Sequence, residues 1–148
     1  MWDKLIERWA DDYSLTASNR TRTYIEPRGF DALQRKLREA TLRHAITGSL
    51  AAARLAAVAP IRLAVLFVDD FETAATTLAL RPVEKGANVL LVEPFDSVVY
   101  DRCVSVEGLH FAALPQVAAD LLTSPGRGPQ EGIALLNWMR VHETEWRA

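Results

Sequence analysis

Residues 61–70 have the sequence IRLAVLFVDD, an apolar and branched run that is interrupted only by Arg62 and ends in two acids. Such a run predicts a central β-strand over 61–68, buried on both faces of a sheet. Asp70 stands where a helix through Leu80 is predicted, and we expect its side chain to cap that helix. Glu72 in the first turn favours the positive end of the same helix.

Further strands and helices are predicted on both sides of this strand. Short apolar runs predict strands at 43–47 and 88–92, and a hairpin around Gly108 joins 103–106 to 109–112. Helices are predicted from about residue 30, at 50–57, where alanine and leucine predominate, and at 115–122. Because helices alternate with strands, we expect an α/β fold in which helices cover a small mixed sheet.

Amphipathic helices are predicted at both ends of the chain. Trp2, Leu5, Ile6, Trp9 and Tyr13 recur at helical spacing near the start, and Leu135, Trp138, Met139, His142 and Trp146 do so near the end. We expect the four tryptophans to be largely buried by packing of these helices on each other or on the sheet. A protein interface is the alternative, because tryptophan is enriched at interfaces.

The composition is that of an ordinary globular protein. The chain has 148 residues, of which 49% are hydrophobic and 24% charged, and its formal net charge is -2. This length predicts a single domain over 1–148, with a helix and an arginine-bearing connector at 1–29 and an α/β core with the last helix at 30–148. The start lacks a signal-peptide pattern and no apolar run is long enough to span a bilayer, so we expect a cytoplasmic protein without membrane contact.

Four residues occur in an order that resembles that of a nucleotidyltransferase site. Gly48 and Ser49 lie at the predicted start of a helix, where backbone amides can hold phosphates. Asp69 and Glu93 lie at the ends of strands, where carboxylates can hold two magnesium ions. Adjacent residues of a strand point to opposite faces, however, so Asp69 and Asp70 cannot both face one metal pair. We therefore expect no catalytic residue, no metal and no cofactor, and any ligand to bind at Gly48, Ser49, Asp69 and Glu93.

Arginines in the predicted connector are candidates for contact with a partner or a nucleic acid. Arg20, Arg22 and Arg28 lie close to Tyr24, so the cations could contact phosphate while the ring stacks on a base. The alternative is that all three arginines are simply solvated.

Arg127 is a further candidate, because it lies between Gly126 and Gly128 in what resembles an anion-binding turn. A tight connection between two helices is the alternative. Asp120 lies in an apolar helix just before this turn, and a buried acid needs a partner. Arg127 is the nearest one along the chain, so we expect a salt bridge between the two residues.

Several segments, taken in their order along the chain, resemble one protein family. They are residues 24–29 (YIEPRG), 46–52 (ITGSLAA), 68–70 (VDD), 88–95 (NVLLVEPF), and 116–122 (QVAADLL) with 126–128 (GRG). They are similar to the C-terminal domain of the AbiEi antitoxin family of type IV toxin–antitoxin systems, in the form found among actinobacterial winged-helix regulators. The resemblance extends from about Trp9 to the end of the chain.

This resemblance implies a reduced form of the nucleotidyltransferase fold and a regulatory role. In such proteins a winged helix-turn-helix precedes this domain and binds DNA, and no room for one exists before Trp2. We therefore expect no specific DNA binding by this chain alone. We expect a non-catalytic effector or partner-binding domain of a transcriptional regulator or antitoxin-like protein, whose partner is the cognate toxin or a second copy. Two alternatives stay open, a magnesium-dependent nucleotidyltransferase and a structural dimerisation module built on the tryptophan helices.

Overall fold

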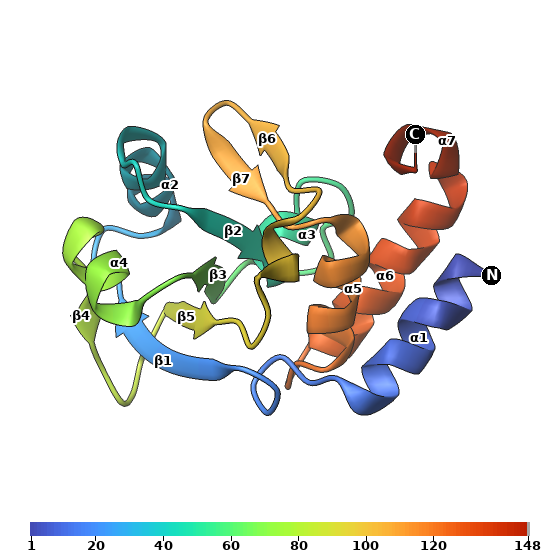
Figure 1. Ribbon diagram of the computed structural model, residues 1–148, viewed down its shortest axis with the longest axis horizontal. Helices are drawn as coiled ribbons and strands as arrows, with labels where there is room; N and C mark the ends of the chain where they lie inside the picture. The colour runs from blue at the N-terminus through green and yellow to red at the C-terminus, as the bar shows by residue number, and fades with distance from the viewer. Residues whose placement is uncertain (148) are drawn as a thin grey trace.

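A computed structural model, which describes residues 1–147, shows one mixed β-sheet with helices packed around it (Figure 1). Within that part of the chain the strand order is β4-β1-β5-β3-β2-β7-β6. The strands are β1 (Arg20–Ile25), β2 (His44–Thr47), β3 (Ala64–Val68), β4 (Arg81–Pro82), β5 (Val89–Glu93), β6 (Val104–Val106) and β7 (Leu109–Phe111). The expected mixed α/β class is confirmed.

The central strand is β3, as its sequence predicts. β3 pairs in parallel with β5 and antiparallel with β2, and all of its residues are buried. The strand is shorter than the predicted 61–68 because its partner β5 begins only at Val89, which lies opposite Ala64. Residues 61–63 therefore have no partner there and lead into the strand as an irregular segment.

The helices form two groups. α1 (Trp2–Asp12), α3 (Gly48–Ala52), α5 (Leu114–Leu122) and α6 (Gly128–Val141) belong to one group, in which α5 contacts the other three. Figure 1 shows α1, α5 and α6 side by side at the right, whereas α2 (Phe30–Glu39) and α4 (Phe71–Thr77) lie at the left. The short η1 (Ser97–Tyr100) follows β5, and α7 (Glu143–Trp146) follows α6. None of the helices in the described part of the chain is long and apolar enough to cross a membrane.

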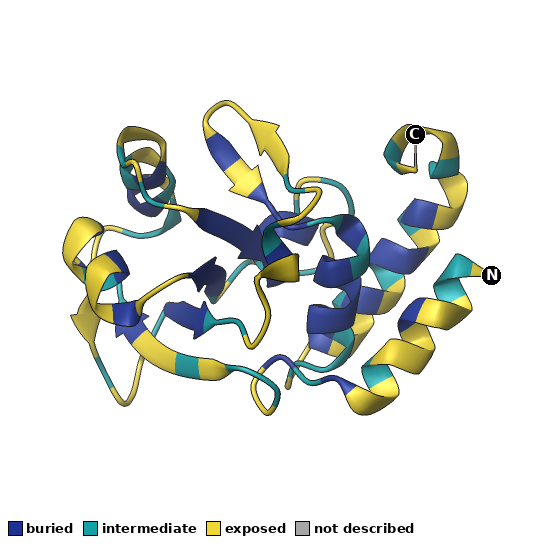
Figure 2. Cartoon of the chain, viewed as in Figure 1, coloured by how far each residue is buried: buried dark blue, intermediate teal, exposed yellow. Residues whose placement is uncertain are grey.

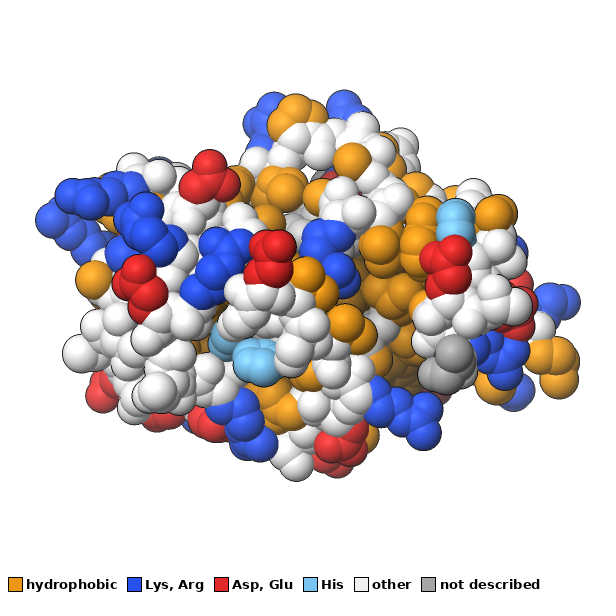
Figure 3. Space-filling view, turned by 90° about the horizontal axis from the view of Figure 1, so that it is seen from above, with side chains coloured by type: hydrophobic (Ala, Val, Ile, Leu, Met, Phe, Trp, Pro, Cys, Tyr) orange, Lys and Arg blue, Asp and Glu red, His pale blue; other side chains and the backbone are white. Residues whose placement is uncertain are grey.

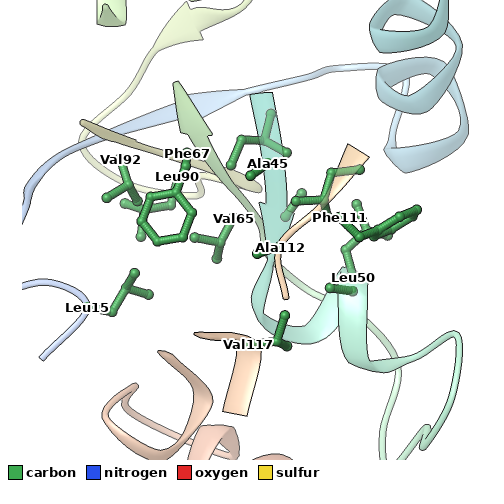
Figure 4. Close-up of a cluster of buried hydrophobic side chains, with 14 of the residues drawn as sticks. Leu15, Ala45, Leu50, Val65, Phe67, Leu90, Val92, Phe111, Ala112 and Val117 are labelled. Carbon is green, nitrogen blue, oxygen red and sulfur yellow. The ribbon is translucent and has the colours of Figure 1, made fainter. Parts of the chain in front are cut away.

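Buried residues concentrate in the central strands and in α5 (Figure 2). Figure 4 shows side chains of β3 and β5, among them Val65, Phe67 and Leu90, in one apolar cluster with Val117 of α5 nearby. This burial of aliphatic and aromatic area is the main source of the fold's stability.

The arginine-bearing segment that was expected to connect the first helix to the core contains a strand, because β1 occupies Arg20–Ile25. β1 pairs with β5 from Arg20 to Tyr24 and with β4 at Tyr24 and Ile25. Its arginine and threonine side chains are mostly exposed, so β1 has little of the apolar character by which strands are recognised. Backbone hydrogen bonds to β5 stabilise it instead.

Three helices end earlier than predicted, among them α4, which ends at Thr77 instead of Leu80. The alanine-rich helix ends at Ala52 instead of residue 57, and Arg54 beyond it lies over the ring of Phe111. The last helix is interrupted at His142, which separates α6 from α7. The Trp146 indole N–H then donates to the backbone carbonyl of Met139, which folds α7 back toward α6.

The expected burial of the four tryptophans is only partly right. Trp2 and Trp146 meet edge-to-face with their ring centroids 4.8 Å apart, so the two terminal helices do pack on each other. Trp138 stacks on His142 and, like Trp2 and Trp146, is half-buried. Trp9 is 36% exposed, although it lies one turn from the buried Ile6, and it stacks on Tyr13 at the margin of the core.

Candidate functional site

The four residues that suggested a nucleotidyltransferase site lie at opposite ends of the central strands. β2 runs antiparallel to β3, with Thr47 opposite Val65. Gly48 and Ser49, which follow Thr47, therefore lie where β3 begins, whereas Asp69 follows the other end of β3. The intervening strand separates the two levels by roughly 13 Å, at about 3.3 Å per residue. Because β5 is parallel to β3, Glu93 lies at the Asp69 end.

The two adjacent acids have different partners, in agreement with the alternation of side chains along a strand. Asp70 caps α4, as predicted, and accepts hydrogen bonds from the backbone N–H of Thr73 at 2.8 Å and from its hydroxyl at 2.9 Å. These contacts lower the pKa of Asp70. Asp69 forms a salt bridge with Arg43, with 2.7 Å between a guanidinium nitrogen and a carboxylate oxygen. The two carboxylates therefore do not point toward a common metal pair.

Glu93 supports the start of α4. One of its oxygens accepts from the backbone N–H of Phe71 at 2.9 Å, and the other forms a salt bridge with Arg20 at 2.9 Å. The guanidinium groups of Arg20 and Arg22 lie over the Phe71 ring, 5.6 and 4.8 Å from its centroid. These two arginines are thus held on β1 by a ring and an acid.

The remaining members of the expected arginine patch lie apart from this cluster. Arg28 is exposed in the turn after β1. Tyr24 is buried, with 3% of its surface exposed, so the expectation that its ring could stack on a base is wrong. Tyr24 is an inward-facing residue of β1 and belongs to the apolar core.

The expected salt bridge between Asp120 and Arg127 is wrong. Asp120 is fully buried and accepts hydrogen bonds from Tyr13 and Thr47, both at 2.6 Å, and from Gln116 at 3.0 Å. Tyr13 follows α1 and Thr47 ends β2, and α5 contacts both elements, whereas Arg127 is exposed in the loop before α6. Burial raises the pKa of Asp120 to about 7, although the three donors oppose this shift.

Gly48, Ser49 and Arg127 do come together, in a pocket of about 830 Å³ at the end of the sheet where β3 begins. The Ser49 hydroxyl donates to Glu131 of α6 at 2.6 Å. Gly48 has a φ of +65°, and a Cβ there would lie 3.2 Å from a methyl group of Val65. A glycine is therefore needed for this sharp turn from β2 into α3.

An exposed apolar surface includes one of the four tryptophans, Trp9, for which a protein interface was the alternative in the sequence analysis. It consists of Leu5 and Trp9 on α1 and Phe95 after β5, which are 64%, 36% and 66% exposed. The Trp9 ring stacks on Tyr13 at 4.9 Å, and the Phe95 ring lies 6.5 Å from Tyr13. We call these three residues the Leu5–Trp9–Phe95 surface. The four-residue spacing of Leu5 and Trp9 was a usable signal, whereas the position of Phe95 depends on the tertiary fold.

Charged side chains form no continuous basic track on the face that Figure 3 displays. Lysine and arginine side chains gather at its left, but acidic side chains lie between the basic groups. Among residues 1–147, no group of three or more His, Cys, Asp or Glu side chains is placed to hold a metal ion.

Comparison with known proteins gives one match. Residues 2–134 match a family described as transcriptional regulator, AbiEi antitoxin, type IV toxin–antitoxin system. No curated protein and no solved structure matches the chain.

Proposed function

Because the chain belongs to the AbiEi antitoxin family of type IV toxin–antitoxin transcriptional regulators, we propose that it is a non-catalytic, protein-binding part of an antitoxin-type regulator. Its partner is the cognate toxin of the same system or a second copy of the chain. The observation that carries this proposal is the exposed Leu5–Trp9–Phe95 surface.

This surface has the chemistry of a protein interface. Contiguous exposed apolar groups mark interaction sites, and tryptophan is prominent among the residues that contribute most to binding energy. The Tyr13 ring between Trp9 and Phe95 is held by hydrogen bonds of its hydroxyl with Asp120 and Asn19. Aromatic groups on such a fixed support lose little conformational entropy when a partner binds.

A cationic residue borders the surface. The Asn19 side chain accepts a hydrogen bond from the backbone N–H of Phe95 at 3.1 Å, and Arg20 follows it directly. The Arg20 side chain is 73% exposed in spite of its salt bridge with Glu93. A charge at the rim of an interface mainly affects the association rate and the choice of partner. Arg20 therefore favours a partner with acidic groups beside its apolar contact.

The arrangement of the acids supports a role without catalysis. Each of the three acids already has a partner: Asp69 pairs with Arg43, Asp70 with Thr73, and Glu93 with Arg20. The turn at Gly48 and Ser49 lies at the opposite end of the central strands. Two-metal phosphoryl chemistry needs carboxylates that converge on ions about 4 Å apart. The alternative of a magnesium-dependent nucleotidyltransferase thus finds no support in this geometry.

The experiment measures both complexes that the chain could form. Light scattering of the purified chain measures its molar mass and so detects a dimer. Calorimetric titration with the purified toxin of the same system measures the affinity for that partner. We expect the double change Trp9→Ala and Phe95→Ala to weaken the observed complex at least about tenfold. Val104→Ala, at an exposed valine of the distant edge strand β6, is the matched control. A monomeric chain that does not bind the toxin would contradict the proposal.

A further inference from the structure

We propose that the pocket lined by Gly48, Ser49 and Arg127 binds a small amphipathic anion, with an apolar body and one anionic head. None of the residues of the Leu5–Trp9–Phe95 surface lines this pocket. The inference therefore does not depend on the identity of the protein partner.

The size and lining of the pocket suit an apolar ligand body. Its volume of about 830 Å³ lies within the range of roughly 300–1,000 Å³ that is usual for small-molecule sites. The apolar part of the lining comes from the sheet, from α5 and from the loops around them, and consists of Leu15, Val58, Ala59, Pro60, Leu63, Val65, Leu90, Leu121 and Pro125. Figure 4 shows Leu15 and Val65 among the apolar side chains in this region.

The charges of the lining favour an anion. Arg62 and Arg127 come from two different loops, at residues 58–63 and 124–127, and both line the pocket. Within residues 1–147 neither guanidinium group has a carboxylate within salt-bridge distance. Glu131 is the acid of the lining, and it already accepts the Ser49 hydroxyl hydrogen bond. The lining therefore carries one more positive than negative charge.

These two features together define the ligand class. A neutral apolar molecule would make no charge-assisted contact with the two exposed guanidinium groups, and a small inorganic anion would leave the apolar wall open to water. An amphipathic anion suits both the apolar wall and the guanidinium groups. Its body covers the apolar side chains while its head accepts charge-assisted hydrogen bonds from Arg62 and Arg127.

The test uses the fluorescent anion 8-anilinonaphthalene-1-sulfonate and its uncharged counterpart N-phenyl-1-naphthylamine, each titrated into the full chain. We expect saturable binding of the anion to one site, weakened about tenfold by Arg62→Gln together with Arg127→Gln. Glu131→Gln should have the opposite effect and tighten binding of the anion. Neither change should alter the affinity for the uncharged dye, and Arg35→Gln on the distant α2 is the matched control.

A steric variant and competition complete the experiment. Ala59→Trp places a large ring into the pocket from a loop and should abolish binding of both dyes. Decanoate and 2-naphthoate should displace the bound anion, whereas decanol should not, and their ranking distinguishes an aliphatic from an aromatic body. Anion binding that is unchanged by Ala59→Trp, or equal sensitivity to the Arg35 and the Arg62/Arg127 changes, would overturn the assignment.

Discussion

The Tyr13 hydroxyl donates a 2.6 Å hydrogen bond to the carboxylate of Asp120, joining the end of α1 to α5. Thr47 at the end of β2 donates to the same carboxylate, so one buried acid connects two helices and the sheet. The other side of the Tyr13 ring supports Trp9 of the proposed interface. The buried network thus holds the Leu5–Trp9–Phe95 surface in place.

The first prediction concerns the pH dependence of this network. Burial raises the pKa of Asp120 from 3.8 to about 7, so the folded state binds this proton more tightly than the unfolded state. The contribution of Asp120 to stability is therefore present below about pH 4 and is lost as the pH rises to about 7. Its full size is up to about 4 kcal/mol.

Asp120→Asn, which keeps the shape of the side chain but does not titrate, isolates this contribution. Relative to the wild type, the variant should gain free energy of unfolding between pH 5 and pH 8. Denaturant unfolding at both pH values measures the difference. A difference that does not change with pH would show that Asp120 titrates in its ordinary range.

The second prediction separates the two adjacent acids. Asp70→Ala removes the cap of α4 and should lower the free energy of unfolding by about 0.5–2 kcal/mol. Asp69→Asn breaks a salt bridge whose side chains are both about half exposed, and should cost less than about 1 kcal/mol. Thermal melts of both variants check this order. The opposite order, or saturable binding of magnesium and a nucleoside triphosphate that both changes abolish, would indicate a metal site.

The third prediction concerns His44, which connects β2 to the β6–β7 hairpin. His44 is buried, and its Nε2 accepts a 3.1 Å hydrogen bond from the backbone N–H of His110. Burial lowers the pKa of His44, so its contribution to stability is lost as the pH falls below the ordinary value of 6.5. His44→Gln should therefore lose less stability than the wild type between pH 7 and pH 5. Equal losses in chemical denaturation would argue against this role.

The fourth prediction is that this chain alone binds duplex DNA weakly and without sequence preference. Its formal net charge is -2, and Arg20, Arg43 and Arg140 are each paired with an acid. The phosphate contacts that remain should weaken steeply with salt. Fluorescence anisotropy with a short labelled duplex at low and physiological salt checks this. Tight, sequence-selective binding at physiological salt would be incompatible with it.

Local signals in the sequence were sufficient for the centre of the fold. The branched apolar run before Asp69 predicted β3. The position of Asp70 just before a helical segment predicted its role as the cap of α4. Both depend on residues that are close together along the chain. β1 was missed because its stability comes from pairing with β5, and its own residues are polar.

The candidate site was less predictable because it depends on the relative direction of neighbouring strands. The residues do not reveal that β2 is antiparallel to β3, and this direction separates Ser49 from Asp69. The partners of Asp120 were missed for a similar reason, since Tyr13 is 107 positions away along the chain and Thr47 is 73. Arg127 was the nearest opposite charge in sequence but not in space.

The most direct test of the proposed function is toxin neutralisation in cells. Growth is measured while the toxin of the same system is expressed with the wild-type chain, with the Trp9→Ala/Phe95→Ala variant, or with the Asp69→Asn/Glu93→Gln variant, each shown to be folded by circular dichroism. We expect the wild type and the acid variant to restore growth and the aromatic variant to fail. Restored growth with the aromatic variant and failure of the acid variant would contradict a protein-binding antitoxin and indicate catalysis.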